Sequence, residues 1–236
     1  LMATYRARSH RFDMAEMVEI SRNISWGNVF RVLDTKNKYG IPAALRLYLR
    51  AALADRFEDE DGRSLCFRDM AIPLHVVVAG LTVDALKHDL YYYEHLLDSA
   101  VGRGTHRLGV SSVVKAAGVI RELLASPEGL REIVMGRTPG TQEFDVVDAA
   151  GFSSAIPGII HYDVLRDDPR SRSILDRLYA EYGITRLGDG GLVANVPARI
   201  GWESLASGVL GHRSGVVVAL DCFAPSRSSP AWFPIQ

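Results

Sequence analysis

Cysteine, excess charge and long apolar runs are all scarce in this sequence. Its 236 residues contain two cysteines, Cys66 and Cys222, which form neither a disulfide framework nor a C-x-x-C metal pattern. We interpret them as ordinary thiols in a reducing compartment. With 27 basic and 28 acidic side chains the formal net charge is −1, which argues against nucleic acid as a partner. No run of about 18 apolar residues occurs, so no transmembrane helix is predicted.

Motifs for phosphate and metal binding are also missing. Neither G-x-x-x-x-G-K-[ST] nor G-x-G-x-x-G occurs, which argues against a nucleotide-binding protein. His88 and His95 would lie two helical turns apart, about 10 Å, which is too far for one zinc ion without other ligands. We therefore expect no metal and no cofactor. The first residues, LMATYRARSHRF, lack the apolar core of a secretory signal, and we expect a cytoplasmic protein.

What the sequence does have is a large share of apolar residues, 47%, which suits one globular domain with a sizeable core. The continuous apolar runs at 72–81 and 214–223 predict buried parallel strands, and a shorter strand with a turn is expected at 184–193. Because strands alternate with helices, the predicted fold class is α/β with a mostly parallel sheet. The spacing of apolar residues predicts helices over 13–33, 39–57, 84–101, 109–135 and 170–182. The helix over 109–135 is expected to break near Ser126-Pro127, and the last helix to end at Gly183.

The stretch RLGDGGLVANVP, residues 186–197, places one carboxylate, Asp189, against two glycines. The local sequence leaves two interpretations open: a tight structural turn, and a carboxylate that acts as a base. Apolar neighbours such as Leu187 favour partial desolvation of the carboxylate, which would make it a stronger base towards a hydroxyl. Gly190 and Gly191 permit a positive φ and close approach of the backbone.

A second stretch, AAGFSSAIPG at 149–158, is rich in small residues. It predicts a helix that packs closely against a sheet or another helix. Ser153 and Ser154 are candidate nucleophiles, but neither stands in G-x-S-x-G, the strand-to-helix turn that exposes a nucleophilic serine. Close packing is therefore the favoured interpretation.

Four segments in one order resemble the second part of a patatin-like phospholipase domain: FRDMAIPLHVVVAGL, DAAGFSSAIPG, RLGDGGLVANVP and VVVALD. The resemblance covers roughly residues 13–223 and is most specific where the SSAIPG and DGG units occur together. It implies a three-layer α/β/α domain that hydrolyses acyl esters, usually of lipids, with a serine–aspartate dyad. Asp189 matches the aspartate that would take the serine proton. Gly190 and Gly191 match positions beside the substrate.

The resemblance also implies two parts that these residues lack. In the family pattern, the G-x-S-x-G elbow with the serine and the glycine-rich loop of the oxyanion hole come first. Because the chain starts with Leu1 and contains no G-x-S-x-G, we expect an N-terminally incomplete fragment. Residues 1–223 would form a partial acyl hydrolase domain, and 224–236 a tail or the start of a following segment. Such a fragment is expected to be inactive alone.

An alternative stays open, in which the nucleophile has been lost and the domain is a non-catalytic binding or scaffold protein. The tyrosines at 91–93 and the aromatic pair at 232–233 would then contact a partner. A hydrolase would instead take a lipid or acyl-ester substrate, with peripheral membrane contact and a lid from 84–135. The sequence predicts no oligomeric state. A G-x-S-x-G sequence upstream would discriminate between the two alternatives.

Overall fold

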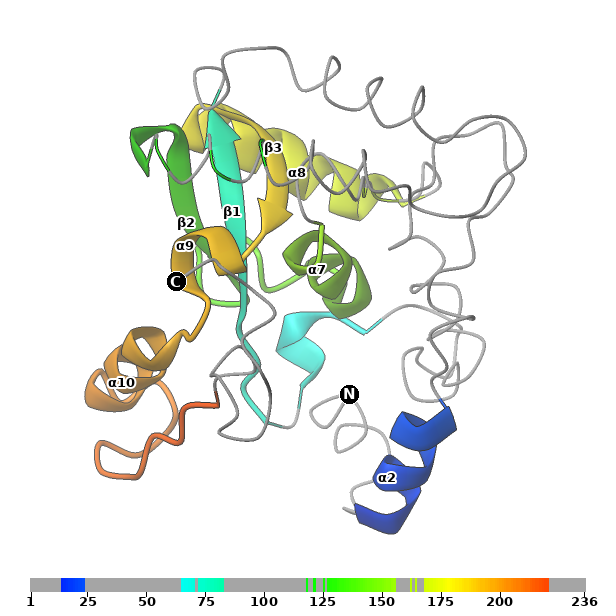
Figure 1. Ribbon diagram of the computed structural model, residues 1–236, viewed down its shortest axis with the longest axis vertical. Helices are drawn as coiled ribbons and strands as arrows, with labels where there is room; N and C mark the ends of the chain where they lie inside the picture. Colours follow the sequence, from blue (N-terminus) through cyan, green and yellow to red (C-terminus); the bar gives the residue numbers. More distant parts are fainter. Residues whose placement is uncertain are drawn as a thin grey trace. The chain divides into compact units, whose positions relative to one another are not determined.

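The chain divides into two compact units, Leu1–Val193 and Ala194–Gln236. Figure 1 labels the helices and strands. The computed structural model describes residues 14–23, 65–70, 72–82, 127–155 and 168–220, together with positions 118, 121, 125, 162 and 164.

In the described part of the first unit, three strands form one sheet. The central strand, β1 (Val76–Thr82), pairs with β2 (Leu130–Met135) and β3 (Ile184–Asp189), one on each side (Figure 1). Both pairings are antiparallel, and Val78 lies opposite Asp189. The predicted mostly parallel sheet, and the three-layer α/β/α arrangement that depends on it, are therefore wrong for the described strands.

Burial of β1 on both faces is the physical reason for this correction. Val77, Val78, Ala79 and Leu81 are each at most 8% exposed, although successive side chains point to opposite faces. A strand covered on both faces is apolar at every position, whatever the direction of its neighbours. A continuous apolar run therefore indicates two-sided burial, which is common in parallel sheets but not confined to them.

Residues 130–135 form strand β2, so the helix predicted over 109–135 is wrong for the part that follows its expected break near Ser126-Pro127. A 3₁₀ turn, η3 (Pro127–Gly129), comes directly before the strand. Proline and glycine both oppose helix continuation, so the helical pattern does not carry through this turn. Ile133 and Val134 are β-branched and favour the extended conformation, in which Ile133 is fully buried.

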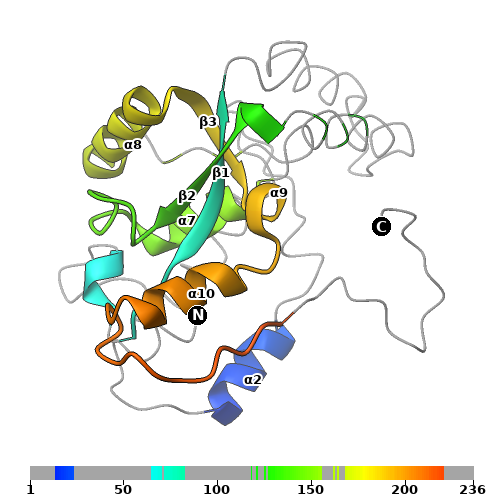
Figure 2. The same cartoon turned by 90° about the vertical axis from the view of Figure 1, so that its left-hand side faces the viewer.

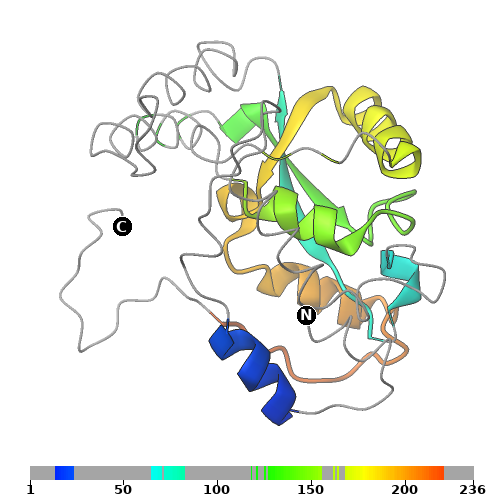
Figure 3. The same ribbon diagram turned by 90° about the vertical axis from the view of Figure 1, so that its right-hand side faces the viewer.

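Two helices pack against this sheet (Figure 2, Figure 3). Helix α7 (Val146–Ser153) contacts β1 and β3, and α8 (Pro169–Tyr182) contacts β3. The ring of Phe152 on α7 lies 4.9 Å from that of Tyr162, centroid to centroid. Gly151 is so close to this tyrosine that a Cβ would lie 2.5 Å from its ring. The close packing predicted for the small residues is confirmed as far as residue 155.

The ends of both helices follow local sequence signals. Asp145 caps α7 by accepting hydrogen bonds from the N–H groups of Val147 and Asp148, and Asp168 caps α8 by accepting one from the N–H of Ser171. Pro169 then occupies the first turn of α8, where its missing N–H costs nothing. Gly183 ends α8 in the left-handed conformation, with φ of 61°. The helix predicted over 170–182 and its end at Gly183 are confirmed.

Two shorter elements come before the sheet in the chain. Helix α2 (Met14–Asn23) confirms part of the helix predicted over 13–33, and η1 (Phe67–Asp69) precedes β1. The predicted helices 39–57 and 84–101, and the aromatic groups at 91–93 and 232–233, lie outside the described residues. Among the helices that are described, none has the length and apolar character needed to cross a membrane.

The second unit contains α10 (Ala198–Ala206), followed by an extended segment that reaches Leu220 (Figure 2). The strand predicted over 214–223 is wrong over 214–220, since these residues pair with no strand in the described part of the chain. Val216 is 89% exposed rather than buried. A β-branched run forms a strand only where a sheet edge is available to pair with it. The predicted boundary at residue 223 lies outside the described residues.

Candidate functional site

Asp189 occupies the last position of β3, where the chain leaves the sheet. Its backbone N–H donates to the carbonyl oxygen of Ala155 at 2.9 Å. Its Oδ1 accepts a hydrogen bond from the N–H of Gly191 at 2.7 Å. A carboxylate bonded to the backbone two residues on makes an Asx turn. The structural turn left open by the sequence is therefore present, and the carboxylate in it is partly buried.

The two glycines after Asp189 differ in what they do. Gly190 is buried, and a Cβ there would overlap the carbonyl oxygen of Val77 on β1. Gly191 is exposed and begins the short helix α9 (Gly191–Ala194). Neither glycine has a positive φ. The sequence therefore predicts the close backbone approach at Gly190 correctly, but the left-handed conformation that these glycines permit is not used.

The C-terminal end of α7 holds the Asp189 turn in place. The carbonyl oxygen of Ser153 accepts a hydrogen bond from the N–H of Gly190 at 3.3 Å. The Ser153 hydroxyl donates to the carbonyl oxygen of Val77 at 2.8 Å. Three segments that are distant in the sequence meet here: the end of α7, the end of β3 and the start of β1. These are parts of three of the four segments on which the family resemblance depends.

Burial raises the pKa of the Asp189 carboxyl above that of an ordinary aspartate, and the hydrogen bond from Gly191 opposes this rise. A carboxylate in a salt bridge would show the opposite direction. The raised pKa makes Asp189 a stronger base than an exposed aspartate. It can accept a proton from a hydroxyl oxygen placed about 2.6–3.2 Å away.

The hydroxyls of Ser153 and Ser154, at the end of α7, donate hydrogen bonds to backbone carbonyls. Ser153 donates to Val77, and the Ser154 hydroxyl donates to Ala150 and Gly151 of its own helix, at 3.0 and 3.1 Å. Among the described residues neither hydroxyl bonds to the Asp189 carboxylate. The geometry therefore agrees with the sequence-based preference for a packing role over a nucleophilic one.

Cys66 is a further potential nucleophile in the first unit. Its side chain is 1% exposed, and burial raises the pKa of its thiol to about 11. The reactive form of a cysteine is the thiolate, which is a minor species at neutral pH when the pKa is this high. The interpretation of Cys66 as an ordinary thiol agrees with this environment, and Cys222 lies outside the described residues.

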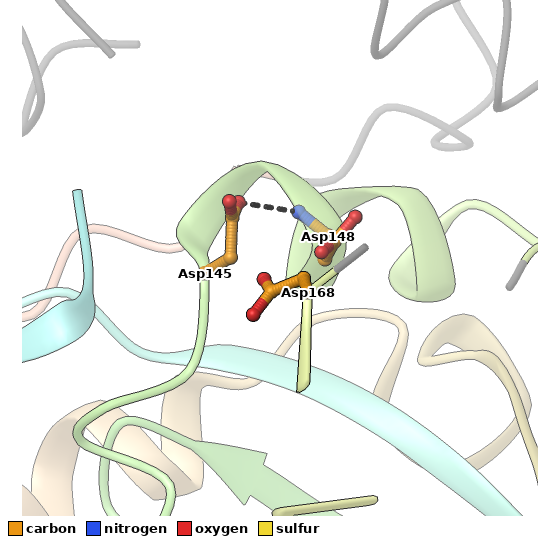
Figure 4. Close-up of side chains that lie close together, drawn as sticks. All are labelled: Asp145, Asp148 and Asp168. Carbon is orange, nitrogen blue, oxygen red and sulfur yellow. Dashed lines mark hydrogen bonds between the residues drawn. The ribbon is translucent and has the colours of Figure 1, made fainter. Parts of the chain in front are cut away.

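One group of carboxylates is close enough to share a cation, and the sequence pattern did not single it out. The side-chain oxygens of Asp145, Asp148 and Asp168 lie within 4.8 Å of one another (Figure 4). Asp145 bonds to two N–H groups at the start of α7, and Asp168 to the N–H and hydroxyl of Ser171. The Tyr162 hydroxyl donates to Asp148. These bonds give the cluster a structural role as two helix caps and an anchor for Tyr162.

Local sequence signals exist for the aspartate cluster, which the sequence analysis did not identify, but not for the contact between Ser153 and Val77. The D-x-x-D spacing of Asp145 and Asp148 is typical of a helix start, and Asp168 before Pro169 is a cap followed by a first-turn proline. No local signal links Ser153 with Val77, because the two are 76 positions apart in the chain. That contact exists only in the folded protein.

Comparison with known proteins adds no relative. No family model matches the chain, no curated protein matches it, and no solved structure matches it. The assignment of Asp189 to a serine–aspartate dyad therefore stays a prediction from the resemblance of its sequence motifs.

Proposed function

We propose that this chain is the base-carrying part of a serine acyl-ester hydrolase in which Asp189 is the catalytic base. The substrate is a lipid or another acyl ester, met in the cytoplasm or at a membrane surface by peripheral contact. The 236 residues contain no G-x-S-x-G, so the nucleophilic serine would come from sequence outside them.

The observation that carries this proposal is the environment of the Asp189 carboxylate. It is partly buried at the end of a strand, with a raised pKa, on a turn held by backbone hydrogen bonds. Gly190 supports it, because the absent side chain lets the turn lie directly against β1. A base held in this way needs little reorganisation when it accepts a proton.

The chemistry follows the general scheme of nucleophilic catalysis. The serine oxygen attacks the acyl carbon of the ester while its proton passes to the Asp189 carboxylate. The ester bond to the alcohol then breaks, and the protonated Asp189 returns the proton to the departing alkoxide. Water then attacks the acyl carbon of the acyl-enzyme while its proton passes to the Asp189 carboxylate. The bond to the serine oxygen breaks, and Asp189 returns the proton to the serine.

The experiment uses the full natural gene product. Ester hydrolysis and labelling by a fluorophosphonate probe are measured for the wild type and for Asp189→Asn. We expect the substitution to lower kcat by several orders of magnitude, because residues of a nucleophile–base pair act as a unit. Circular dichroism should show an unchanged fold.

Asp176→Asn is the matched control, because Asp176 is an exposed aspartate on α8. It should retain wild-type turnover. If Asp189→Asn retained turnover as well, Asp189 would not be the base. A wild type that neither hydrolyses esters nor reacts with the probe would contradict the hydrolase itself and favour a non-catalytic role.

A further inference from the structure

Ser153 connects two strands that it does not belong to. It is the last residue of α7, and its hydroxyl donates to the carbonyl oxygen of Val77 on β1 at 2.8 Å. Its own carbonyl oxygen accepts from the N–H of Gly190, 3.3 Å away, in the turn after β3. One residue thus bonds to the starting end of β1 and to the residue that follows Asp189.

The Val77 carbonyl lies where the sheet loses its regular pairing. The β1–β3 register runs as far as Val78 opposite Asp189, and the next residue, Gly190, belongs to the turn. Gly190 approaches the Val77 oxygen so closely that no side chain fits between them. The Ser153 hydroxyl supplies the hydrogen bond that this carbonyl receives at the end of the sheet, where a buried acceptor without a partner would be costly.

We propose that Ser153 is a positioning residue for Asp189: its hydroxyl and its carbonyl together fix the end of α7 to β1 and to the Asp189 turn. Ser153 acts through Val77 and Gly190 and makes no contact with the acyl group. The catalytic meaning of this role rests on the proposed function, but the positioning itself is a property of the folded chain.

Ser154 provides a matched control from the neighbouring position. Among the described residues, its hydroxyl donates within α7 alone, to Ala150 and Gly151. Ser154→Ala therefore removes a serine hydroxyl from the same helix end without touching β1 or the turn. An effect of Ser153→Ala that Ser154→Ala does not share comes from the lost hydrogen bond to Val77, because alanine keeps the backbone carbonyl that bonds to Gly190.

The titration of Asp189 in the full natural gene product is the direct test. Aspartate carboxyl carbons are labelled with ¹³C, and the signal of Asp189 is assigned as the one that is missing in Asp189→Asn. The midpoint of its pH titration is then measured by NMR. In Ser153→Ala we expect the midpoint to fall towards that of an exposed aspartate, because a loosened turn admits water to the carboxylate. Ser153→Thr, which keeps the hydroxyl, should restore the wild-type midpoint, and Ser154→Ala should not change it.

Two outcomes overturn the proposal. One is an Asp189 midpoint in Ser153→Ala equal to that of the wild type. The other is an equal change in Ser154→Ala. If Ser153→Ala does not fold, Ser153→Cys is used in its place, because a thiol keeps the volume of the side chain but is a weak hydrogen-bond donor. The Asp189 titration midpoint in Ser153→Cys then tests the proposal in the same way.

A kinetic arm in the same gene product separates this proposal from the proposed function. Ser153→Ala should lower kcat on the order of tenfold with KM nearly unchanged, as for loss of an interaction that matters in the transition state. Ser153→Thr should recover kcat. A wild type without esterase activity would remove the hydrolase, while the NMR titration would still decide whether Ser153 positions Asp189.

Discussion

Gly190 is a single residue whose lack of a side chain lets two backbones meet. Any Cβ at this position would overlap the carbonyl oxygen of Val77, which belongs to the central strand and cannot move without disturbing the sheet. We predict that Gly190→Ala lowers the free energy of unfolding by about 2–3 kcal/mol, as forced overpacking typically does. Urea denaturation followed by circular dichroism measures this.

Gly201 gives the corresponding control for a glycine-to-alanine change. It lies inside α10, and a Cβ there would meet Val217 at an ordinary 3.6 Å. Gly201→Ala should therefore be neutral or stabilise α10 by about 0.5–1 kcal/mol, since alanine is the better helix former. Equal effects of the two substitutions would contradict the tight contact at Gly190.

Asp189 itself is predicted to reduce the stability of the fold at neutral pH. Its folded-state pKa is raised by burial, so folding favours its protonated form. The stability contributed by this proton is fully present below the unfolded pKa of about 3.9 and is lost as the pH rises through the folded pKa. At pH 7, Asp189→Asn should therefore unfold at a higher urea concentration than the wild type.

The pH dependence distinguishes this effect from a general change in charge. The advantage of Asp189→Asn should shrink as the pH falls from the folded pKa towards the unfolded one, because the wild-type carboxyl becomes neutral as well. Asp176→Asn, at the exposed position on α8, controls for removal of one negative charge. An advantage of Asp189→Asn that stayed constant from pH 7 to pH 3 would argue against a raised pKa.

At the scale of elements, α7 depends on its cap. Asp145 is fully buried, and its Oδ1 accepts from the N–H groups of Val147 and Asp148 at 2.7 and 3.0 Å. Asp145→Ala leaves both donors without this acceptor, and we predict a loss of about 1–2 kcal/mol in the free energy of unfolding. Thermal and urea unfolding monitored by circular dichroism provide the measurement.

Asparagine at the same position tests whether the acceptor oxygen is what matters. Asp145→Asn keeps a side-chain oxygen of similar reach, and asparagine is as good a cap as aspartate. It should therefore lose clearly less stability than Asp145→Ala. If both substitutions cost the same, the negative charge within the cluster of Asp145, Asp148 and Asp168 would be the stabilising feature instead.

Helix ends and strand direction were predictable to different degrees at this scale. The end of α8 at Gly183 was read from the sequence because an αL glycine is a local requirement. Strand β2 was not, because Leu130–Met135 is extended only when paired with β1. The end of α8 therefore follows from a local sequence signal. The strand conformation of β2 depends on pairing with a segment far away in the chain.

For the whole molecule, the two apolar valine runs have opposite environments. Val78 on β1 is fully buried, while Val216 in the second unit is 89% exposed. We predict that Val78→Thr costs about 1–3 kcal/mol, because it buries a hydroxyl in an apolar core. Val216→Thr should change the free energy of unfolding by no more than about 0.5 kcal/mol, as is usual for exposed positions.

Urea denaturation of the two variants makes the comparison direct, since the chemical change is the same. A large cost at Val216 would mean that residues 214–220 are buried in a sheet, as the sequence suggested. A small cost at Val78 would contradict the described core around the central strand. Val218, at 74% exposure, offers a repeat of the Val216 measurement.

The sequence by itself determined the features that depend on neighbours along the chain. These include the helix at Pro169–Tyr182 with its glycine stop, the strand that ends at Asp189, and the contrast between apolar and charged segments. It also marked Asp189 and Gly190 as a position where a carboxylate and a close backbone approach coincide. Capping, turn chemistry and backbone sterics act within a few residues, so they can be read without a fold.

Only the tertiary structure decided the direction of the strands, the exposure of residues 214–220 and the connection of Ser153 to Val77. The apolar character of a segment indicates how much of it is buried once it pairs with or packs against another segment. It does not indicate which segment that is. Pairing is a property of residues far apart in the chain. For that reason the position of Asp189 follows from the sequence, whereas the contacts that hold it do not.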